Sequence, residues 1–271
     1  MRISLLFVFA GLLLASCGEY QKLLRSDDTA KKYAVADSLY NLGKYKKALK
    51  LMEQIVPAYR GKPQAEALMY KHANTYYNLE DYYLAGYQFE RFETSYPQSD
   101  SVEVAAFKSA KSYYGLSPRY SLDQKDTEKA LEKLQNFINK YPNSNYRLEA
   151  NALVKELREK IEKKDFEVAK QYLLTAETLG TFNPAIQAFD NFIADHPGSS
   201  YRKDAFLGRL KAQYLLAINS VPSKVEPRLL EAKKYYDSFV KYYSESDLKE
   251  EADEFLQDIE KRLTKKETAI N

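Results

Sequence analysis

The feature that most constrains this chain is a helix–turn–helix pattern within Tyr70–Pro97. Apolar residues recur at helical spacing on both sides of a break at Leu79–Asp81. In the second half they form a single stripe made of Tyr82, Ala85, Phe89 and Phe92. Pro97 ends this half because proline disfavours helical backbone in the preceding residue and has no N–H to donate. A hairpin of this kind leaves an apolar face uncovered, so the pattern predicts further copies on either side.

Four further copies of the stripe occur along the chain. They consist of Tyr45, Ala48, Met52 and Ile55; Ala130, Leu134 and Phe137; Phe182, Ala185, Phe189 and Phe192; and Ala232, Tyr236 and Phe239. The order of glycine, tyrosine, alanine, phenylalanine and proline resembles the tetratricopeptide repeat, whose period is about 34 residues. This resemblance implies an all-α fold over residues 30–271: a right-handed superhelical solenoid of about five hairpins with a C-terminal capping helix.

Three irregular segments interrupt the repeats. Residues 115–126 and 218–227 are insertions, and each is expected to lengthen the turn of its hairpin. Such insertions either contact partners or are tolerated surface loops, and the sequence favours neither. Residues 147–179 contain no Gly or Pro, so they form one long helix or two helices that separate near residues 163–165. The charged segment 247–266 is expected to be the capping helix.

The repeats end in similar short segments, in which a proline stops one helix and a polar residue starts the next. The segments are Tyr96–Ser99, Tyr141–Ser144, His196–Ser199 and, in a degenerate form without proline, Tyr243–Ser246. Asp100 with Glu103, and Asp247 with Glu250, further predict capping boxes for the helices that follow.

The N-terminus has the pattern of a lipoprotein signal peptide, predicted to span residues 1–16. Arg2 precedes the apolar run Ile3–Ala15, which is shorter than the roughly 20 residues that a membrane-spanning helix needs. Leu14–Cys17 resembles a bacterial lipobox, and Cys17 is the only cysteine. We therefore expect lipidation of Cys17, by palmitate or a similar acyl chain, followed by a tether over residues 17–29. The alternative is an ordinary signal peptide with an incidental cysteine.

Charge and motifs argue against several classes of function. The 41 basic and 38 acidic residues nearly balance, whereas nucleic-acid-binding proteins usually have a clear basic excess. His72 and His196 are the only histidines, and neither lies at metal-ligand spacing from other candidate ligands. No nucleophile, phosphate-binding or metalloprotease motif is present. The sequence therefore predicts no catalytic site, no cofactor, no metal and no nucleic-acid partner.

The best candidate for a functional site is a surface. In tetratricopeptide arrays the first helix of each repeat lines a groove, and here those positions are aromatic with one polar residue between. By register they are Tyr33, Asp37 and Tyr40; Tyr70, Asn74 and Tyr77; and Phe107, Lys111 and Tyr114. Tyrosine combines apolar area with a hydroxyl, which suits binding of an extended peptide. The alternative is that these rings pack between helices.

A lipobox followed by five such repeats with aromatic–Pro exits resembles the BamD (YfiO) family of outer-membrane lipoproteins. The resemblance implies a lipid-anchored scaffold that faces the periplasm and belongs to the β-barrel assembly machinery. Its N-terminal repeats would bind unfolded outer-membrane proteins, and its C-terminal repeats would dock the periplasmic domains of the barrel component. Two other hypotheses are a tetratricopeptide lipoprotein that coordinates cell-wall synthesis or division, and a glycan-binding lipoprotein. The chain has no Trp for sugar stacking.

Overall fold

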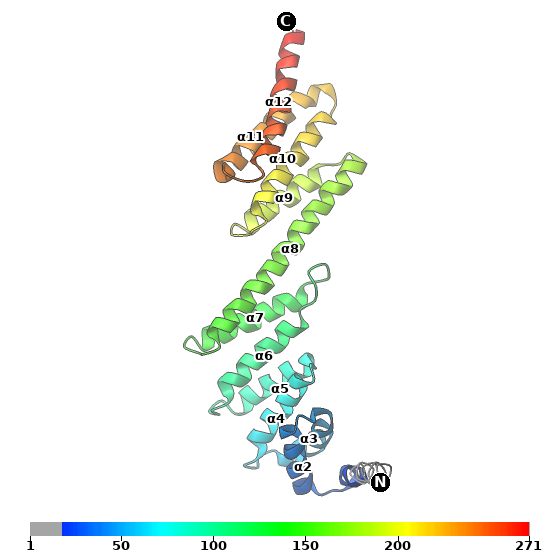
Figure 1. Ribbon diagram of the computed structural model, residues 1–271, viewed down its shortest axis with the longest axis vertical. Helices are drawn as coiled ribbons and strands as arrows, with labels where there is room; N and C mark the ends of the chain where they lie inside the picture. The colour runs from blue at the N-terminus through cyan, green and yellow to red at the C-terminus, as the bar shows by residue number, and fades with distance from the viewer. Residues whose placement is uncertain (1–17, 271) are drawn as a thin grey trace, which may run out of the picture. The chain divides into compact units, whose positions relative to one another are not determined.

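The computed structural model describes residues 18–270, and every regular element in that range is an α-helix (Figure 1). Residues 18–25 are helical. The later helices are α2 (Thr29–Asn41), α3 (Tyr45–Tyr59), α4 (Ala65–Asn78), α5 (Tyr82–Ser95), α6 (Val102–Leu116), α7 (Lys125–Lys140), α8 (Arg147–Leu179), α9 (Asn183–Asp195), α10 (Arg202–Ile218), α11 (Pro222–Tyr243) and α12 (Lys249–Ile270). The predicted all-α array of helix hairpins is confirmed. The predicted signal peptide and Cys17 lie outside the described residues.

The chain divides into two compact units. Unit 1 is Met1–Pro118 with Asp123–Leu157, and unit 2 is Arg119–Leu122 with Arg158–Asn271. Unit 1 therefore contains the hairpins α2–α3, α4–α5 and α6–α7, and unit 2 contains α9, the hairpin α10–α11 and α12. Helix α8 contributes to both units and is a single helix of 33 residues. This answers the question of one helix or two, because no glycine or proline breaks the segment.

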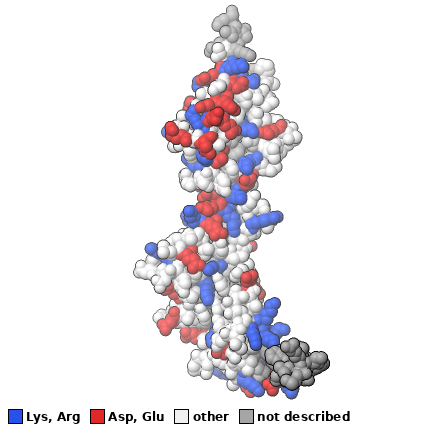
Figure 2. Space-filling model, viewed as in Figure 1, with Lys and Arg blue, Asp and Glu red and all other residues white. Residues whose placement is uncertain are grey.

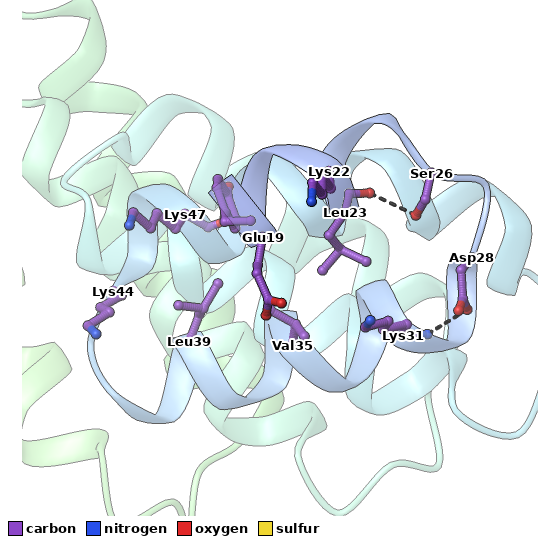
Figure 3. A pocket seen from close by; sticks show the side chains of 11 residues that line it. Glu19, Lys22, Leu23, Ser26, Asp28, Lys31, Val35, Leu39, Lys44 and Lys47 are labelled. Carbon is purple, nitrogen blue, oxygen red and sulfur yellow. Dashed lines mark hydrogen bonds between the residues drawn. The ribbon is translucent and has the colours of Figure 1, made fainter. Parts of the chain in front are cut away.

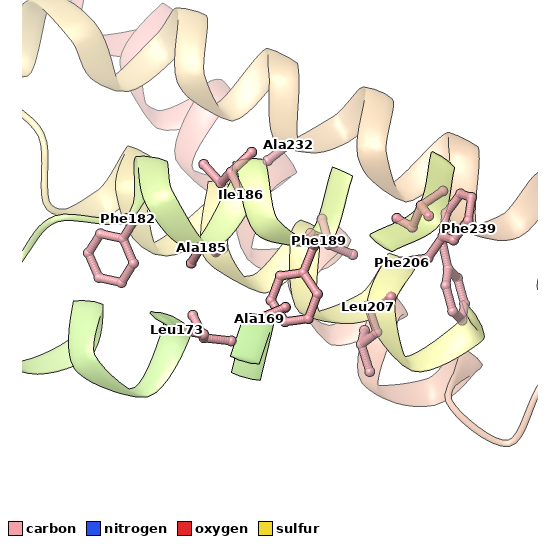
Figure 4. Packing of buried hydrophobic residues seen from close by; sticks show 14 of the residues in the cluster. Ala169, Leu173, Phe182, Ala185, Ile186, Phe189, Phe206, Leu207, Ala232 and Phe239 are labelled. Atoms are coloured by element: carbon pink, nitrogen blue, oxygen red, sulfur yellow. The ribbon is translucent and has the colours of Figure 1, made fainter. Parts of the chain in front are cut away.

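The alanine of the stripe is fully buried in all five repeats. Ala48, Ala85, Ala130, Ala185 and Ala232 each have 0% of their surface exposed. In unit 2, Figure 4 shows Ala185 and Phe189 of α9 among side chains of the neighbouring helices. A small side chain at this position permits close helix approach, and the larger apolar residues one and two turns later fill the space beside it. The register predicted from the sequence is therefore confirmed.

Three of the hairpin turns place one residue in the left-handed region of the backbone. These residues are Gly43 at φ 69°, Glu80 at φ 61° and Gly180 at φ 71°. Glycine adopts this conformation without steric cost, whereas Glu80 has a Cβ that crowds the backbone. Asp81 follows Glu80 and caps α5, since its carboxylate accepts a hydrogen bond from the Leu84 N–H at 3.3 Å. The break predicted at Leu79–Asp81 is confirmed.

The segments between repeats share a serine-based turn in place of the predicted capping boxes. The hydroxyls of Ser99, Ser144, Ser199 and Ser246 each accept a hydrogen bond from the backbone N–H two residues later, at 3.0–3.2 Å. Glu103 does not close a capping box with Asp100, because its carboxylate accepts a hydrogen bond from the Ser144 hydroxyl at 2.6 Å. Asp247 pairs with Lys203. Cross-repeat contacts therefore replace the local ones.

The two insertions have different structures. Residues 117–124 are a loop between α6 and α7, as predicted, and in unit 2 Lys164 Nζ donates to the Leu122 carbonyl at 2.7 Å. The prediction of a longer turn at residues 218–227 is wrong, because α11 already begins at Pro222 and continues through Pro227. Proline at the first helical position needs no N–H partner, and it holds Val221 in the extended conformation.

The predicted tether over residues 17–29 is also wrong where the structure describes it. Residues 18–25 form a helix, and Leu23 is buried in a cluster with Ala36, Ala48 and Leu51 of the first hairpin. Tyr20 adds a hydrogen bond from its hydroxyl to the Lys47 carbonyl at 2.9 Å. Burial of an apolar side chain by the first hairpin offsets the entropy of ordering this segment.

Candidate peptide-binding face

The nine residues predicted to line a groove lie on three helices of unit 1. Tyr33, Asp37 and Tyr40 are on α2; Tyr70, Asn74 and Tyr77 are on α4; and Phe107, Lys111 and Tyr114 are on α6. Spacings of three and four residues place each set of three on one side of its helix. We call this surface the first-helix face.

Polar side chains connect the three helices across this face. Asp37 of α2 forms an ion pair with Lys71 of α4. Asn74 is buried: its Nδ2 donates to the Tyr40 hydroxyl, and its Oδ1 accepts from Lys108 Nζ of α6 at 2.6 Å. The amide of Asn74 therefore links all three helices, and both of its polar groups are satisfied.

The same pattern continues from α6 to α8 within unit 1. Lys111 Nζ lies 2.6 Å from Glu149 Oε1, and the Tyr114 hydroxyl donates to Glu156 Oε1 at 2.7 Å. The hydrogen bond to Glu149 is the largest cause of the raised pKa of Lys111. The polar side chains of the first-helix face are thus bonded mainly to other groups of the protein. The repeat pattern did not predict these bonds, because each of them joins side chains of different repeats.

The tyrosine rings of the face pack against neighbouring aromatic rings and stay partly exposed. The Tyr33 ring stacks on Tyr59 with centroids 5.1 Å apart. Tyr70 is edge-on to Phe92 at 5.6 Å, and Tyr77 is edge-on to Tyr82 at 5.8 Å. Tyr33, Tyr40, Tyr70, Tyr77 and Tyr114 are all half-buried. The two readings of these tyrosines are therefore compatible, because a half-buried ring can pack between helices and still leave part of its surface exposed.

Phe107 differs from the tyrosines because it is only 4% exposed. The ring of Tyr146 stacks over it with centroids 4.6 Å apart and an interplanar angle of 12°. Tyr146 follows the segment Tyr141–Ser144, which ends the third repeat, and lies just before α8. Phe107 thus contributes little surface itself, and Tyr146, which the sequence pattern did not single out, covers it.

Two lysines also belong to this face. Lys71 Nζ lies 5.5 Å from the Tyr40 ring centroid, and Lys108 Nζ lies 5.8 Å and 5.6 Å from those of Tyr70 and Tyr77. Burial lowers the pKa of Lys108 and raises that of Tyr70 and Tyr77. The sequence carries a signal for both lysines, since each directly follows the first aromatic residue of its helix. A cation at this distance from a ring is attracted by the electrons of the ring face.

Among residues 18–270, no group of three or more histidine, cysteine, aspartate or glutamate side chains is arranged to hold a metal ion. His72 is buried beside Tyr76, with ring centroids 4.9 Å apart. His196 Nε2 lies 3.0 Å from Asp165 Oδ2. In the part of the chain that the structure describes, no helix is both long and apolar enough to cross a membrane.

A family described as YfiO, outer membrane lipoprotein, matches residues 25–179. No curated protein matches the chain. Among solved structures, a Podosopora anserina protein with TPR-like repeats, described as a kinesin light chain, has 15% identity and a TM-score of 0.33 over 79% of this chain and 95% of that chain. The TPR2AB domain of yeast Sti1, solved in a complex with pHSP90, has 13% identity and a TM-score of 0.39 over 86% and 98%.

Proposed function

The chain belongs to the YfiO family of outer membrane lipoproteins, and from this premise we propose that it is a periplasmic scaffold of the β-barrel assembly machinery. In this role unit 1 binds unfolded outer-membrane proteins and unit 2 docks the barrel component, so that the client is held close to the protein that inserts it. The scaffold performs no chemistry, and its contribution is to bring the two partners together.

The first-helix face is the observation that supports client binding. Unfolded barrel proteins present many different strands, so a receptor for them needs apolar contact that tolerates sequence variation. The partly exposed tyrosine rings supply such contact. The polar groups between them are already bonded to one another, as in the links among Tyr40, Asn74 and Lys108. A peptide therefore covers the face without leaving these polar groups of the protein buried and unpaired, which would otherwise cost about 1–3 kcal/mol each.

Docking of the barrel component is assigned to unit 2 because part of α8 there presents apolar side chains to solvent. Val168, Tyr172 and Leu179 are 43%, 49% and 67% exposed. Their helical spacing places them along one side of the helix, while Ala169, Leu173 and Ala176 on another side are buried in the core of unit 2. Exposed apolar residues in a row favour a protein partner.

Attachment to the outer membrane is assigned to a lipid on Cys17, which lies outside the described residues. The Leu14–Cys17 motif supports this assignment. Replacing the thiol, in Cys17→Ser, is expected to release the protein into the soluble periplasm or to leave its signal peptide uncut. Fractionation of cells that express each form measures this. Membrane retention equal to wild type, with normal cleavage, would contradict lipid anchoring.

Capture from the native envelope tests the scaffold role as a whole. Wild-type protein is expected to co-purify the barrel component, identified by mass spectrometry. The double variant Tyr172→Ser/Leu179→Ser is expected to lose it, because both apolar contacts become polar. The matched control is Tyr83→Ser/Tyr87→Ser, which changes exposed aromatic residues of α5. Recovery of peptidoglycan synthases in place of the barrel component would favour a cell-wall or division role and overturn the proposal.

A further inference from the structure

Positive charge is concentrated at the N-terminal end of unit 1. Residues 18–62 hold ten Lys and Arg residues against five Asp and Glu residues, whereas residues 63–271 hold 30 against 33. Figure 2 shows Lys and Arg side chains gathered at this end of the unit. The basic and acidic residues of the whole chain are therefore nearly equal in number only because a basic first repeat is combined with a slightly acidic remainder.

A pocket of about 460 Å³ lies within this basic region. The helix over residues 18–25, α2 and the start of α3 form its walls (Figure 3). Leu23, Val35 and Leu39 give it an apolar floor. Lys22, Lys31, Lys44 and Lys47 line its edge, and all four are exposed. None of the four ammonium groups forms an ion pair with any residue the structure describes, so their charge is available to a ligand.

We infer that this end of unit 1 lies on an anionic phospholipid surface, with a lipid headgroup in the pocket. The inference deepens the proposed function, in which Cys17 is lipidated, because the helix at residues 18–25 follows that residue directly. Lysines beside a membrane anchor attract anionic headgroups, and the two interactions add. The apolar floor accommodates the less polar part of the lipid beneath its phosphate.

Two carboxylates, those of Glu19 and Asp28, also line the pocket. Asp28 caps α2, since its Oδ1 accepts a hydrogen bond from the Lys31 N–H at 2.8 Å. Glu19 is exposed and has no ion pair with the described residues. An unpaired carboxylate opposes an anionic headgroup, so Glu19 weakens the binding that the lysines provide. Removing the charge of Glu19 is therefore expected to strengthen vesicle binding, whereas removing the lysine charges is expected to weaken it.

The test measures vesicle binding by unlipidated protein, residues 17–271 carrying Cys17→Ser, so the result does not depend on the anchor. Vesicles contain phosphatidylcholine alone or phosphatidylcholine mixed with phosphatidylglycerol. We expect binding to the mixed vesicles only, and weaker binding at high salt. In the triple variant Lys22→Gln/Lys44→Gln/Lys47→Gln, the partition coefficient is expected to fall roughly a hundredfold, since each lysine near the surface contributes about fivefold. Glu19→Gln is expected to raise it a fewfold.

The matched control is Lys224→Gln/Lys241→Gln/Lys261→Gln, which removes the same charge from exposed positions of unit 2. This control is expected to bind as wild type, and thermal melting verifies that all variants are folded. Equal losses in the two triple variants, binding to phosphatidylcholine alone, or calorimetric binding of inorganic phosphate without vesicle binding would each overturn the inference. A failure of Cys17 lipidation changes none of these measurements, so the inference and the proposed anchor are tested separately.

Discussion

Glu80 adopts a backbone conformation that glycine adopts at the same place in two other hairpins. Its φ is 61°, beside 69° for Gly43 and 71° for Gly180. A Cβ in this region costs roughly 1–2 kcal/mol, and part of that is offset because glycine has more freedom in the unfolded chain. Glu80→Gly is therefore expected to raise the free energy of unfolding by about 0.5–1 kcal/mol in urea denaturation. Gly43→Ala is the matched reverse change, and a stabilising effect of that substitution would contradict the argument.

His72 makes stability depend on pH. It is 6% exposed, its Nε2 has no hydrogen-bond partner among the described residues, and burial lowers its pKa to about 4. The charge of Arg91 is a second, smaller cause of this lowered pKa. The unfolded chain protonates this histidine near its ordinary pKa of about 6.5, whereas the folded chain does not. The contribution of His72 to the free energy of unfolding is therefore fully present above about pH 6.5. It is lost as the pH falls toward 4, and the total loss is roughly 3 kcal/mol.

Two measurements check this expectation. Nuclear magnetic resonance is expected to show one of the two histidines titrating near pH 4, and His196→Gln assigns the remaining signal to His72. The unfolding free energy of His72→Phe is expected to fall less between pH 7 and pH 4 than that of wild type. A His72 signal that titrates near 6.5 would show that the ring is accessible to solvent.

At the scale of the helices, Gly208 of α10 illustrates how packing overrides helix propensity. A Cβ added there would lie 2.4 Å from Cζ of Phe189, a ring that is buried in the core of unit 2. Alanine is the better helix former by about 1 kcal/mol, but overpacking of a core typically costs about 1–3 kcal/mol. Gly208→Ala is thus expected to lower the melting temperature. Gly198→Ala, where nothing lies within 4 Å of the added Cβ, is expected to leave it nearly unchanged.

The helices were largely predictable from the sequence because the same stripe recurs five times. One alignment of the five repeats places Ala85 and its four equivalent alanines at the same buried position. Features that depend on contacts between repeats were not predictable in this way. The Glu103 carboxylate accepts a hydrogen bond from Ser144, in the segment that follows α7. Residues 18–25 fold onto the first hairpin. Residues 218–227 were predicted to lengthen a turn, although Pro222 within them starts helix α11.

The sequence predicted which residues form the first-helix face, but it did not predict the hydrogen bonds between them. Register alone placed Tyr70, Asn74 and Tyr77 on one side of α4. The link from Tyr40 through Asn74 to Lys108 joins three different repeats, so no pattern within a single repeat indicates it. The stacking of Tyr146 over Phe107 likewise depends on how the chain enters α8. Contacts between side chains of different repeats are therefore the part of this array that the repeat pattern does not predict.

At the scale of the whole molecule, the proposed client binding depends on the partly exposed aromatic rings of unit 1. Polar members of the face are bonded internally and differ in sign, so peptide affinity is expected to vary little with salt. Removing the rings in Tyr70→Ala/Tyr77→Ala is expected to weaken binding by about tenfold or more, because each aromatic contact is worth about 0.5–1.5 kcal/mol beyond its buried area. Tyr70→Phe/Tyr77→Phe keeps the rings and is expected to bind within a fewfold of wild type.

The most direct test is the affinity of peptides from the ends of barrel proteins for these two double variants, measured at low and high salt beside circular dichroism. The matched control is Tyr83→Ala/Tyr87→Ala, which removes two exposed tyrosines from α5 of the same repeat. The account predicts weakened binding for Tyr70→Ala/Tyr77→Ala alone, with helicity retained and little effect of salt. Unchanged affinity in that folded variant, or an equal loss in the α5 control, would contradict client binding at the first-helix face.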